Sequence, residues 1–580
     1  MKYMRLTAIA LLALLTVAGC GNKEEPANTS SSNSSNELLS YVPADTPYLA
    51  ANLEPVPEEV LDAFLERLQP VLDTMQSRLT SARGELEAQQ DNPDARLAHA
   101  LLMEFDGKLS RQGLESMGFD LRSKRVLYGM GAFPVVRLSL SDAQALRDTV
   151  LRVMDNAQIT AAEQELQGVS YWRLSDEGAS GVSAGLYISI FDDHLALALF
   201  PTMAEAELLP AFLGLELPTG SNAQARLETL NKAQGYTGYG SGILDVQKFA
   251  DQFLTPDTPA GKAMAASGEF DPATISPECV AEIHEIIAHT PRMTVGVKEL
   301  SKSSFAAQYR LETPETLAGQ LMGLVSKIPA ADKLSNRILE LSFGMRFGPV
   351  RDFLLEKATA IVNDPYQCER LAQLNENAAE SLAQLNQPMP PFLNNFQGVR
   401  VSLSEFKPIQ DAMPENTRGQ MAVHVEQPQM FIGMAQMFLP DLSSLTIKPG
   451  EPPVRLPENL IPVPGLVAFA AMSDDAIGLA LGEGEEDGLT AFLDRKAGPE
   501  GMFLSASYDM AAYLEYSEKL GEYQPDLSDT DGEGHTSHAE AARELQEAMS
   551  IALKKMADRS DSSMSFTPGG LVIDSRTTFK

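Results

Sequence analysis

The chain has 580 residues, of which 44% are hydrophobic, and its formal net charge is −34. A single hydrophobic core stops growing near about 250–300 residues, so this length predicts more than one core. Repulsion from phosphate groups makes nucleic acid and anionic lipid surfaces poor partners for so acidic a chain. A cationic partner or divalent ions stay compatible with the charge, although a solvated acidic surface explains it more simply.

The N-terminal residues predict export and lipidation. Residues 1–5 are positively charged, and residues 6–17 form an apolar run. That run is too short to span a bilayer, which needs roughly 20 residues, but it suits a signal peptide. Val17-Ala18-Gly19-Cys20 resembles the lipobox of bacterial lipoproteins. We therefore expect residues 1–19 to be cleaved and acyl chains on Cys20 to hold the protein on a membrane.

A disordered tether is expected over residues 20–38, because this stretch is polar, rich in Ser and Asn, and without apolar periodicity. By resemblance to enterobacterial lipoproteins, Gly21 after the cysteine favours the outer membrane over the inner membrane. The expected location is therefore the cell envelope, with the folded part facing the periplasm.

Four groups of elements follow in chain order. A strand at 48–53 leads into an amphipathic helix with apolar residues at helical spacing from Val60 to Met75. Strands at 125–130 and 135–140 precede a helix that opens on Ser141-Asp142-Ala143-Gln144, a capping-box signature. Strands at 186–190 and 195–199, joined by Asp192-Asp193, precede a helix with Ala211-Phe212-Leu213. A strand then ends at Asp245, which we expect to cap the next helix, and 293–297 forms a hairpin with 305–311.

The same order recurs further along the chain. A strand at 341–347 leads into a helix at 350–361, and strands at 399–403 and 421–425 precede a helix from Gln429. Strands at 466–472 and 477–481, joined by Asp474-Asp475, precede a helix with Ala491-Phe492-Leu493. A strand then ends at Asp509, the expected cap of the next helix, and 564–566 forms a hairpin with 571–579. The Asp-Asp turns lie 282 positions apart (474 − 192) and the Ala-Phe-Leu triplets 280 apart (491 − 211). So small a drift predicts a tandem duplication.

The expected fold is therefore α+β, with one repeat over residues 39–335 and a second over 336–580. Each repeat would be an antiparallel sheet with helices packed on one face. The two halves could pair into a single sheet. Once Cys20 is lipidated, only Cys279 and Cys368 remain, and an oxidising compartment predicts a disulfide between them across the join. Without CxxC spacing, metal binding by these two cysteines is improbable.

Three motifs resemble catalytic or metal-binding patterns without meeting their requirements. His284 and His289 flank a glutamate but are five residues apart, whereas a zinc-binding helix needs four. Gly181-Val182-Ser183-Ala184-Gly185 matches GxSxG, but a strand is expected after the serine, where a nucleophile elbow needs a helix. The acidic stretch 525–538 lacks the first and twelfth ligands of an EF-hand and is best interpreted as a loop with weak attraction for calcium at most.

Several apolar or glycine-rich features have both structural and functional interpretations. Gly235, Gly238, Gly240 and Gly242 lack the spacing of a dinucleotide-binding loop, so we expect close backbone packing. Met430, Met434 and Met437 fall on one helix face, which suits a lipid or a partner helix, although core packing is the favoured interpretation. The proline-rich stretches 388–393 and 456–466 could contact a partner or bilayer, but packing over the body is the simpler expectation.

Several short segments resemble one family of uncharacterised proteobacterial envelope proteins. They are Val42-Pro43-Ala44-Asp45-Thr46-Pro47 before the first strand, Met117-Gly118-Phe119-Asp120, Tyr128-Gly129, Pro134-Val135-Val136-Arg137-Leu138, Cys279 and Pro291-Arg292. The resemblance is diffuse, although it spans most of the mature chain. It implies a repeated α+β domain that opens with a PADTP strand and implies no activity.

The sequence predicts a non-enzymatic binding or scaffolding lipoprotein with no metal or cofactor. Its expected partners are the membrane, through the acyl chains, and either an envelope protein or a hydrophobic ligand in a groove between the halves. Nucleic acid is not an expected partner. The alternative is an envelope hydrolase whose active site is not recognisable from sequence.

Overall fold

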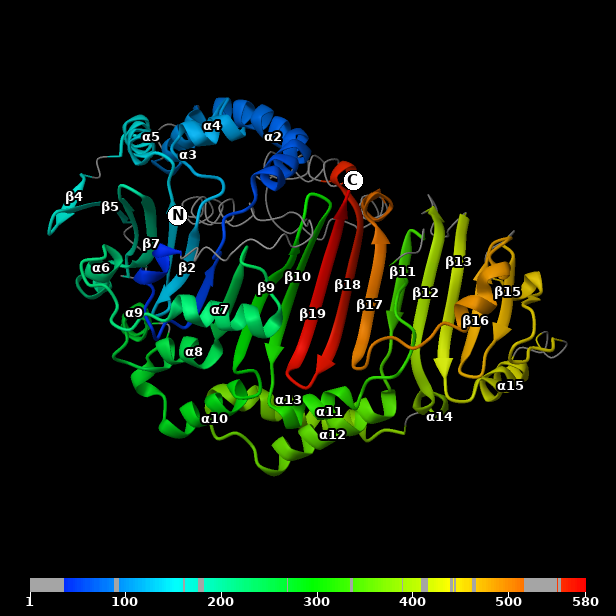
Figure 1. Ribbon diagram of the computed structural model, residues 1–580. Coiled ribbons are helices and arrows are strands. Elements are labelled where there is room, and N and C mark those ends of the chain that lie inside the picture. The colour runs from blue at the N-terminus through cyan, green and yellow to red at the C-terminus, as the bar shows by residue number, and fades with distance from the viewer. Residues whose placement is uncertain are drawn as a thin grey trace.

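The computed structural model describes residues 36–87, 93–159, 162–175, 182–268, 270–333, 337–388, 390–407, 416–438, 442, 445–461, 466–515, 550 and 554–580. Within these ranges, nineteen strands form one continuous sheet (Figure 1). Every pairing between its strands is antiparallel. The expected mixed α/β class with a large antiparallel sheet is confirmed.

The strands from the first part of the chain lie next to one another in the sheet, and we call them the first run. From the outside inward, it consists of β4 (Gln164–Leu166), β5 (Val169–Ser175), β6 (Ala184–Ile190), β7 (His194–Pro201), β3 (Phe133–Ser139), β2 (Arg125–Met130), β1 (Tyr48–Ala51), β8 (Ser241–Asp245), β9 (Arg292–Leu300) and β10 (Ser304–Glu312). The hairpin expected at the end of the first half is the β9–β10 pair. Strands β4 and β5 were not among the expected elements.

The second run comes from the rest of the chain. From the join outward, it consists of β19 (Gly570–Phe579), β18 (Ala557–Thr567), β17 (Met502–Asp509), β11 (Leu339–Phe343), β12 (Phe396–Lys407), β13 (Asn416–Val425), β16 (Ala476–Leu481), β15 (Ala468–Met472) and β14 (Val454–Arg455). Strands β10 and β19 pair along their length, from Ser304 opposite Thr578 to Glu312 opposite Gly570. The two runs therefore share one sheet.

The helices lie on the faces and beyond the ends of these strands. They are α2 (Glu58–Glu87), α3 (Pro93–Phe105), α4 (Arg111–Ser116), α5 (Ala143–Asn156), α6 (Glu205–Phe212), α7 (Ala223–Gln234), α8 (Val246–Leu254), α9 (Pro259–Ser267), α10 (Pro277–Ile287), α11 (Glu315–Met322), α12 (Phe347–Asn363), α13 (Ala372–Leu385), α14 (Pro391–Asn394), α15 (Pro428–Phe438) and α16 (Leu489–Leu493). Figure 1 shows α11, α12 and α13 together beyond one end of the central strands. No helix among the described residues is both long and apolar enough to cross a bilayer.

Helices cover both faces of the first run, whereas we expected them on one. On one face, Phe212 of α6 and Leu227 of α7 pack with Tyr128 of β2. On the other face, Leu146 of α5 packs with Trp172 of β5. The reason is that strands such as β7 (HLALALFP) carry apolar side chains at nearly every position, so both faces must be shielded from water.

The expected aspartate caps are present at helix N-termini. Asp245 accepts a hydrogen bond from the backbone N–H of Lys248 (3.0 Å), and Asp509 accepts one from Ala512 (2.8 Å). At α5 the cap is Asp142, which accepts from the N–H of Ala145, rather than the Ser141 of the expected capping box. Each aspartate thus satisfies a backbone N–H that has no partner within its helix.

The folded part begins earlier than expected. Asn36 is buried, and its side-chain amide donates to the backbone carbonyl of Asn52 (2.8 Å). It also caps the short 3-10 helix Glu37–Tyr41, whose Leu38 is buried. Residues 36–38 are therefore part of the body and not of the predicted tether.

Candidate functional site

The cysteine pair is joined as the sequence predicts. The Sγ atoms of Cys279, in α10, and Cys368 are 1.91 Å apart and form a disulfide. The carboxylate of Glu282 accepts hydrogen bonds from the backbone N–H groups of Gln367 (2.7 Å) and Cys368 (2.9 Å). This contact and the disulfide tie α10 to the segment between α12 and α13. The third predicted site residue, Cys20, lies outside the described residues, as do the predicted signal peptide and the tether up to residue 35.

The motifs that resemble catalytic patterns are not assembled into a site within the described residues. The Nε2 atom of His284 lies 2.7 Å from Oδ1 of Asp251, while His289 follows the end of α10 and is exposed. Strand β6 begins directly after Ser183, and Gly181 lies outside the described residues, as does the acidic stretch 525–538. No group of three or more His, Cys, Asp or Glu side chains in the described part could hold a metal ion.

The methionine-lined helix is not packed in a core as we favoured. Met437 of α15 is 79% exposed and Met430 is 37% exposed. Periodicity places these residues on one face but does not say what that face meets. The proline-rich stretches are described in part only, because residue 389 and residues 462–465 lie outside the described ranges.

The glycine series before Asp245 has the predicted packing role. A Cβ added to Gly242 of β8 would lie 3.1 Å from Cβ of Ala50 on the neighbouring strand β1. Gly235 ends α7 in the left-handed conformation, with φ of 66°, which is costly for residues with a Cβ. These glycines let α7 turn sharply back into β8, so helix and strand lie close together.

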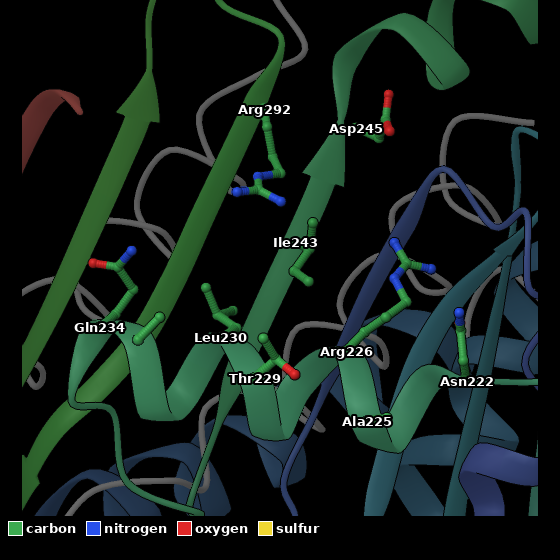
Figure 2. Close-up of a pocket in the computed structure, with 10 residues that line it drawn as sticks. Asn222, Ala225, Arg226, Thr229, Leu230, Gln234, Ile243, Asp245 and Arg292 are labelled. Carbon is green, nitrogen blue, oxygen red and sulfur yellow. The ribbon is translucent and has the colours of Figure 1, made fainter. Parts of the chain in front are cut away.

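An open groove of about 380 Å³ runs between α7 and strand β8, which we call the α7 groove (Figure 2). Its apolar wall includes Leu230 of α7 and Ile243 of β8, both buried, together with Ala225 and Ala233. Arg226, Leu230 and Ala233 are spaced at i, i+4 and i+7, so they share one side of the helix. The volume falls within the roughly 300–1,000 Å³ that small-molecule sites occupy.

Arg226 provides the groove with a cation whose Nη1 atom lacks a hydrogen-bond partner. Figure 2 shows its side chain extending from α7 into the groove, with Arg292 extending from β9. The Nη1 atom of Arg226 is shielded from solvent and has no hydrogen-bond partner. Burial lowers the pKa of the Arg226 guanidinium; the Asp245 carboxylate opposes this shift and Arg292 adds to it. An unpaired donor of this kind is costly to bury and favours an acceptor from outside the chain.

The other charged groups at the groove are already paired. Arg292 of β9 donates two hydrogen bonds, each 2.8 Å long, to the two carboxylate oxygens of Glu312 in β10. This is a bidentate contact between the two strands. The Asp245 carboxylate accepts a hydrogen bond from the backbone N–H of Lys248 at the N-terminus of α8. The groove therefore combines an apolar wall with a guanidinium that keeps one donor, Nη1, without an acceptor, which can bind an anionic or polar head attached to an apolar body.

Each run also buries an arginine beside a histidine. In the first run, Arg137 donates to the Tyr128 hydroxyl (3.1 Å) and to Nε2 of His194 (2.9 Å), and the ring of Tyr41 lies 3.8 Å from its guanidinium carbon. Arg137 is fully buried and enclosed by these aromatic groups. Because all of its partners are protein groups, this cluster stabilises the core and leaves no room for a ligand.

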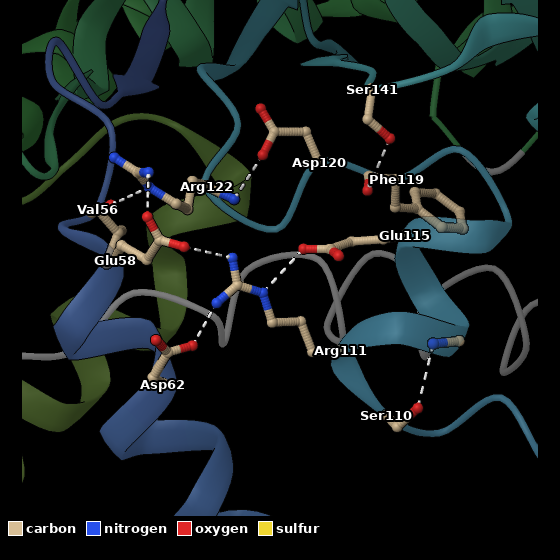
Figure 3. A network of polar contacts seen from close by, with 11 residues as sticks. Val56, Glu58, Asp62, Ser110, Arg111, Glu115, Phe119, Asp120, Arg122 and Ser141 are labelled. Atoms are coloured by element: carbon tan, nitrogen blue, oxygen red, sulfur yellow. Dashed lines mark hydrogen bonds and ion pairs between the residues drawn. The ribbon is translucent and has the colours of Figure 1, made fainter.

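An exposed ionic network near α2 also has a structural explanation. Arg111 of α4 contacts the carboxylates of Glu58, Asp62 and Glu115, and Arg122 reaches Glu58 at 3.5 Å and the carbonyl of Val56 at 2.8 Å (Figure 3). The hydrogen bonds with Glu115 and Glu58 raise the pKa of Arg111. Ion pairs at such exposed positions contribute little stability, so the network mainly fixes how α2 meets α4.

The α7 groove was not predicted from the sequence. Its two arginines are 66 positions apart (292 − 226), and neither belongs to a recognisable motif. The available signal was Gly235, which ends α7 in the left-handed conformation, together with the glycine-rich stretch that follows it up to Asp245. These glycines indicate that a helix and a strand lie close together. No family model, curated protein or solved structure matches this chain.

Proposed function

We propose that this protein is a non-enzymatic binding lipoprotein of the bacterial envelope and that the α7 groove is its ligand site. The observation that carries the proposal is the buried, unpartnered Nη1 of Arg226 beside an apolar wall. Such a combination suits a hydrophobic ligand with a polar end. The groove lies within the first run, whereas the sequence suggested a groove between the halves.

The same proposal places the protein on a membrane through acyl chains at Cys20, in the outer membrane and facing the periplasm. The lipobox-like sequence and Gly21 support this location. The disulfide between Cys279 and Cys368 is consistent with an oxidising compartment. Radiolabelled palmitate should be incorporated into the wild-type chain and not into a Cys20→Ser variant, and equal labelling of the two would refute lipidation at this residue.

We also propose that the two runs arose by tandem duplication, in keeping with the resemblance to envelope proteins with a repeated domain. In each run we number the strands outward from the β10–β19 join, so that β10 and β19 both have position one. The chain enters each run at position four and continues through positions five and six. It then takes positions nine, eight and seven, and returns through three, two and one. An identical path over nine strands supports duplication; β4 is an addition to the first run.

Native mass spectrometry of the purified full chain tests the ligand proposal. We expect a co-purifying molecule that is lost when Ala233→Trp fills the groove. Ala233 is exposed, so the larger side chain is tolerated by the fold. The control is Ala281→Trp, at an exposed position of α10 away from the groove, which should retain the ligand. A ligand retained in both variants would refute the α7 groove as its site.

A scaffolding role predicts a different result. If the wild-type chain carries no ligand, a protein partner becomes the better explanation of what this protein binds. Crosslinking in cells followed by affinity purification would then identify that partner, and Ala233→Trp should leave its recovery unchanged. Loss of the partner in this variant would instead show that the groove contacts protein.

A further inference from the structure

We infer that the α7 groove binds a linear aliphatic chain that ends in a carboxylate, with the Arg226 guanidinium as the partner of the carboxylate. This inference rests on the proposed function and specifies its ligand class. It depends on three features of the groove, namely its charge balance, its shape and the hydrogen-bonding state of Arg226.

The charge balance favours a single negative charge. Four charged side chains line or border the groove, and three of them have partners: Arg292 and Glu312 pair with each other, and Asp245 caps α8. Arg226 is the groove arginine that keeps a donor, Nη1, without an acceptor, although the Asp245 carboxylate favours its charged form. The carboxylates of Asp245 and Glu312 repel any negative group in the groove, and they repel a group with two charges roughly twice as strongly as a carboxylate.

The hydrogen-bonding state of Arg226 favours an acceptor with two oxygens. A guanidinium matches the planar geometry of a carboxylate and can bind it through two parallel hydrogen bonds. The buried Nη1 of Arg226 has no acceptor, so a ligand oxygen there would remove an existing cost. A neutral hydroxyl would satisfy the atom but would leave the positive charge uncompensated.

The shape of the groove favours a straight chain. Its lining residues on α7 extend from Ala225 to Gln234, and the part from Arg226 to Gln234 covers about 12 Å at 1.5 Å per residue. Beyond Arg226 the wall is formed largely by Leu230, Ala233 and Ile243, which carry no charge. An aliphatic chain lying along α7 would bury its methylenes against this wall while its carboxylate meets Arg226 at one end.

Calorimetric titration of the full chain with decanoate, 1-decanol and decyl phosphate tests the inference. We expect decanoate to bind most tightly, and Arg226→Gln to weaken decanoate by at least about tenfold, because hydrogen bonds to charged groups contribute roughly 1.5–3 kcal/mol. Binding of 1-decanol should weaken much less in this variant, because its hydroxyl carries no charge. The control is Arg455→Gln, an exposed arginine of β14 at the far edge of the second run, which should leave all three ligands unaffected.

The outcomes separate this inference from the proposed function. Equal binding of decanoate and 1-decanol, unchanged in Arg226→Gln, would overturn the carboxylate while leaving an apolar ligand site in place. Tighter binding of decyl phosphate than of decanoate would overturn the preference for a single charge. If no ligand binds, or if Ala233→Trp leaves binding unchanged, the groove itself fails as the site.

Discussion

Arg137 and Arg400 make the same buried contact in the two runs of the sheet. Each donates to a backbone carbonyl within an Ala-Phe-Leu triplet: Arg137 to Phe212, and Arg400 to Phe492 at 2.8 Å. Their surroundings differ, however. Arg137 has further partners in Tyr128 and His194, whereas Nε and Nη2 of Arg400 are buried without any partner. Burial and the nearby Arg495 lower the pKa of Arg400 to about 10.

This difference predicts unequal costs for the same substitution. Arg137→Met should destabilise the protein by about 3 kcal/mol, because it leaves the Phe212 carbonyl and His194 without their donor. Arg400→Met should cost about 1 kcal/mol or less, since it also removes two buried nitrogen atoms, Nε and Nη2, that have no hydrogen-bond partner. Urea unfolding of both variants, followed by circular dichroism, measures the two values. A larger loss for Arg400→Met than for Arg137→Met would contradict this interpretation.

His424 should make the stability depend on pH. Burial, aided by Arg400, lowers its pKa from 6.5 to about 4, and Asp475, with Oδ2 4.0 Å away, opposes the shift. Above pH 6.5 the histidine is neutral in both the folded and unfolded states. As the pH falls from 6.5 towards 4, only the unfolded state takes up this proton, so stability is lost progressively, by up to about 3 kcal/mol.

Substitution of this residue provides the measurement. His424→Leu should reduce the dependence of the unfolding free energy on pH between 6.5 and 4, while His194, whose pKa is also lowered by burial, should retain part of it. His289→Gln, at an exposed position, should retain the wild-type slope. If the slope in His424→Leu equals that of the wild-type chain, the loss of stability arises from other groups.

The Cys279–Cys368 disulfide should be a major source of stability. It closes a loop with a sequence separation of 89 residues, and the chain-entropy model assigns about 4–5 kcal/mol to a loop of that size. Replacing both cysteines by serine should therefore lower the unfolding free energy by several kcal/mol. Reductant should destabilise the wild-type chain and have no effect on the double variant. Free thiols at both positions in the unreduced protein would refute the bond.

The cap of α5 gives a local test. Asp142→Ala should destabilise the protein by about 1 kcal/mol, because the N–H of Ala145 loses its acceptor. Asp142→Asn keeps an acceptor oxygen at that position and should recover most of the stability. Thermal unfolding compares the two variants, and an equal loss in both would show that the charge, rather than the hydrogen bond, matters.

Local pattern was sufficient to predict many of the elements. The alternation of apolar residues predicted β2 at 125–130, and an aspartate before an amphipathic run predicted the caps at Asp245 and Asp509. These predictions succeed because each depends on neighbours within one or two turns of chain. The disulfide was also predictable, since only two cysteines remain after Cys20.

Only the tertiary structure decided what each face meets. The methionine stripe of α15 has helical spacing, yet Met437 is largely exposed, because periodicity gives no information about a neighbouring element. Likewise, Arg226 is an ordinary helical arginine in the sequence. It becomes a candidate ligand partner because packing of α7 against β8 removes water from Nη1 without supplying an acceptor. Desolvation depends on atoms brought together from distant parts of the chain, and local sequence does not encode it.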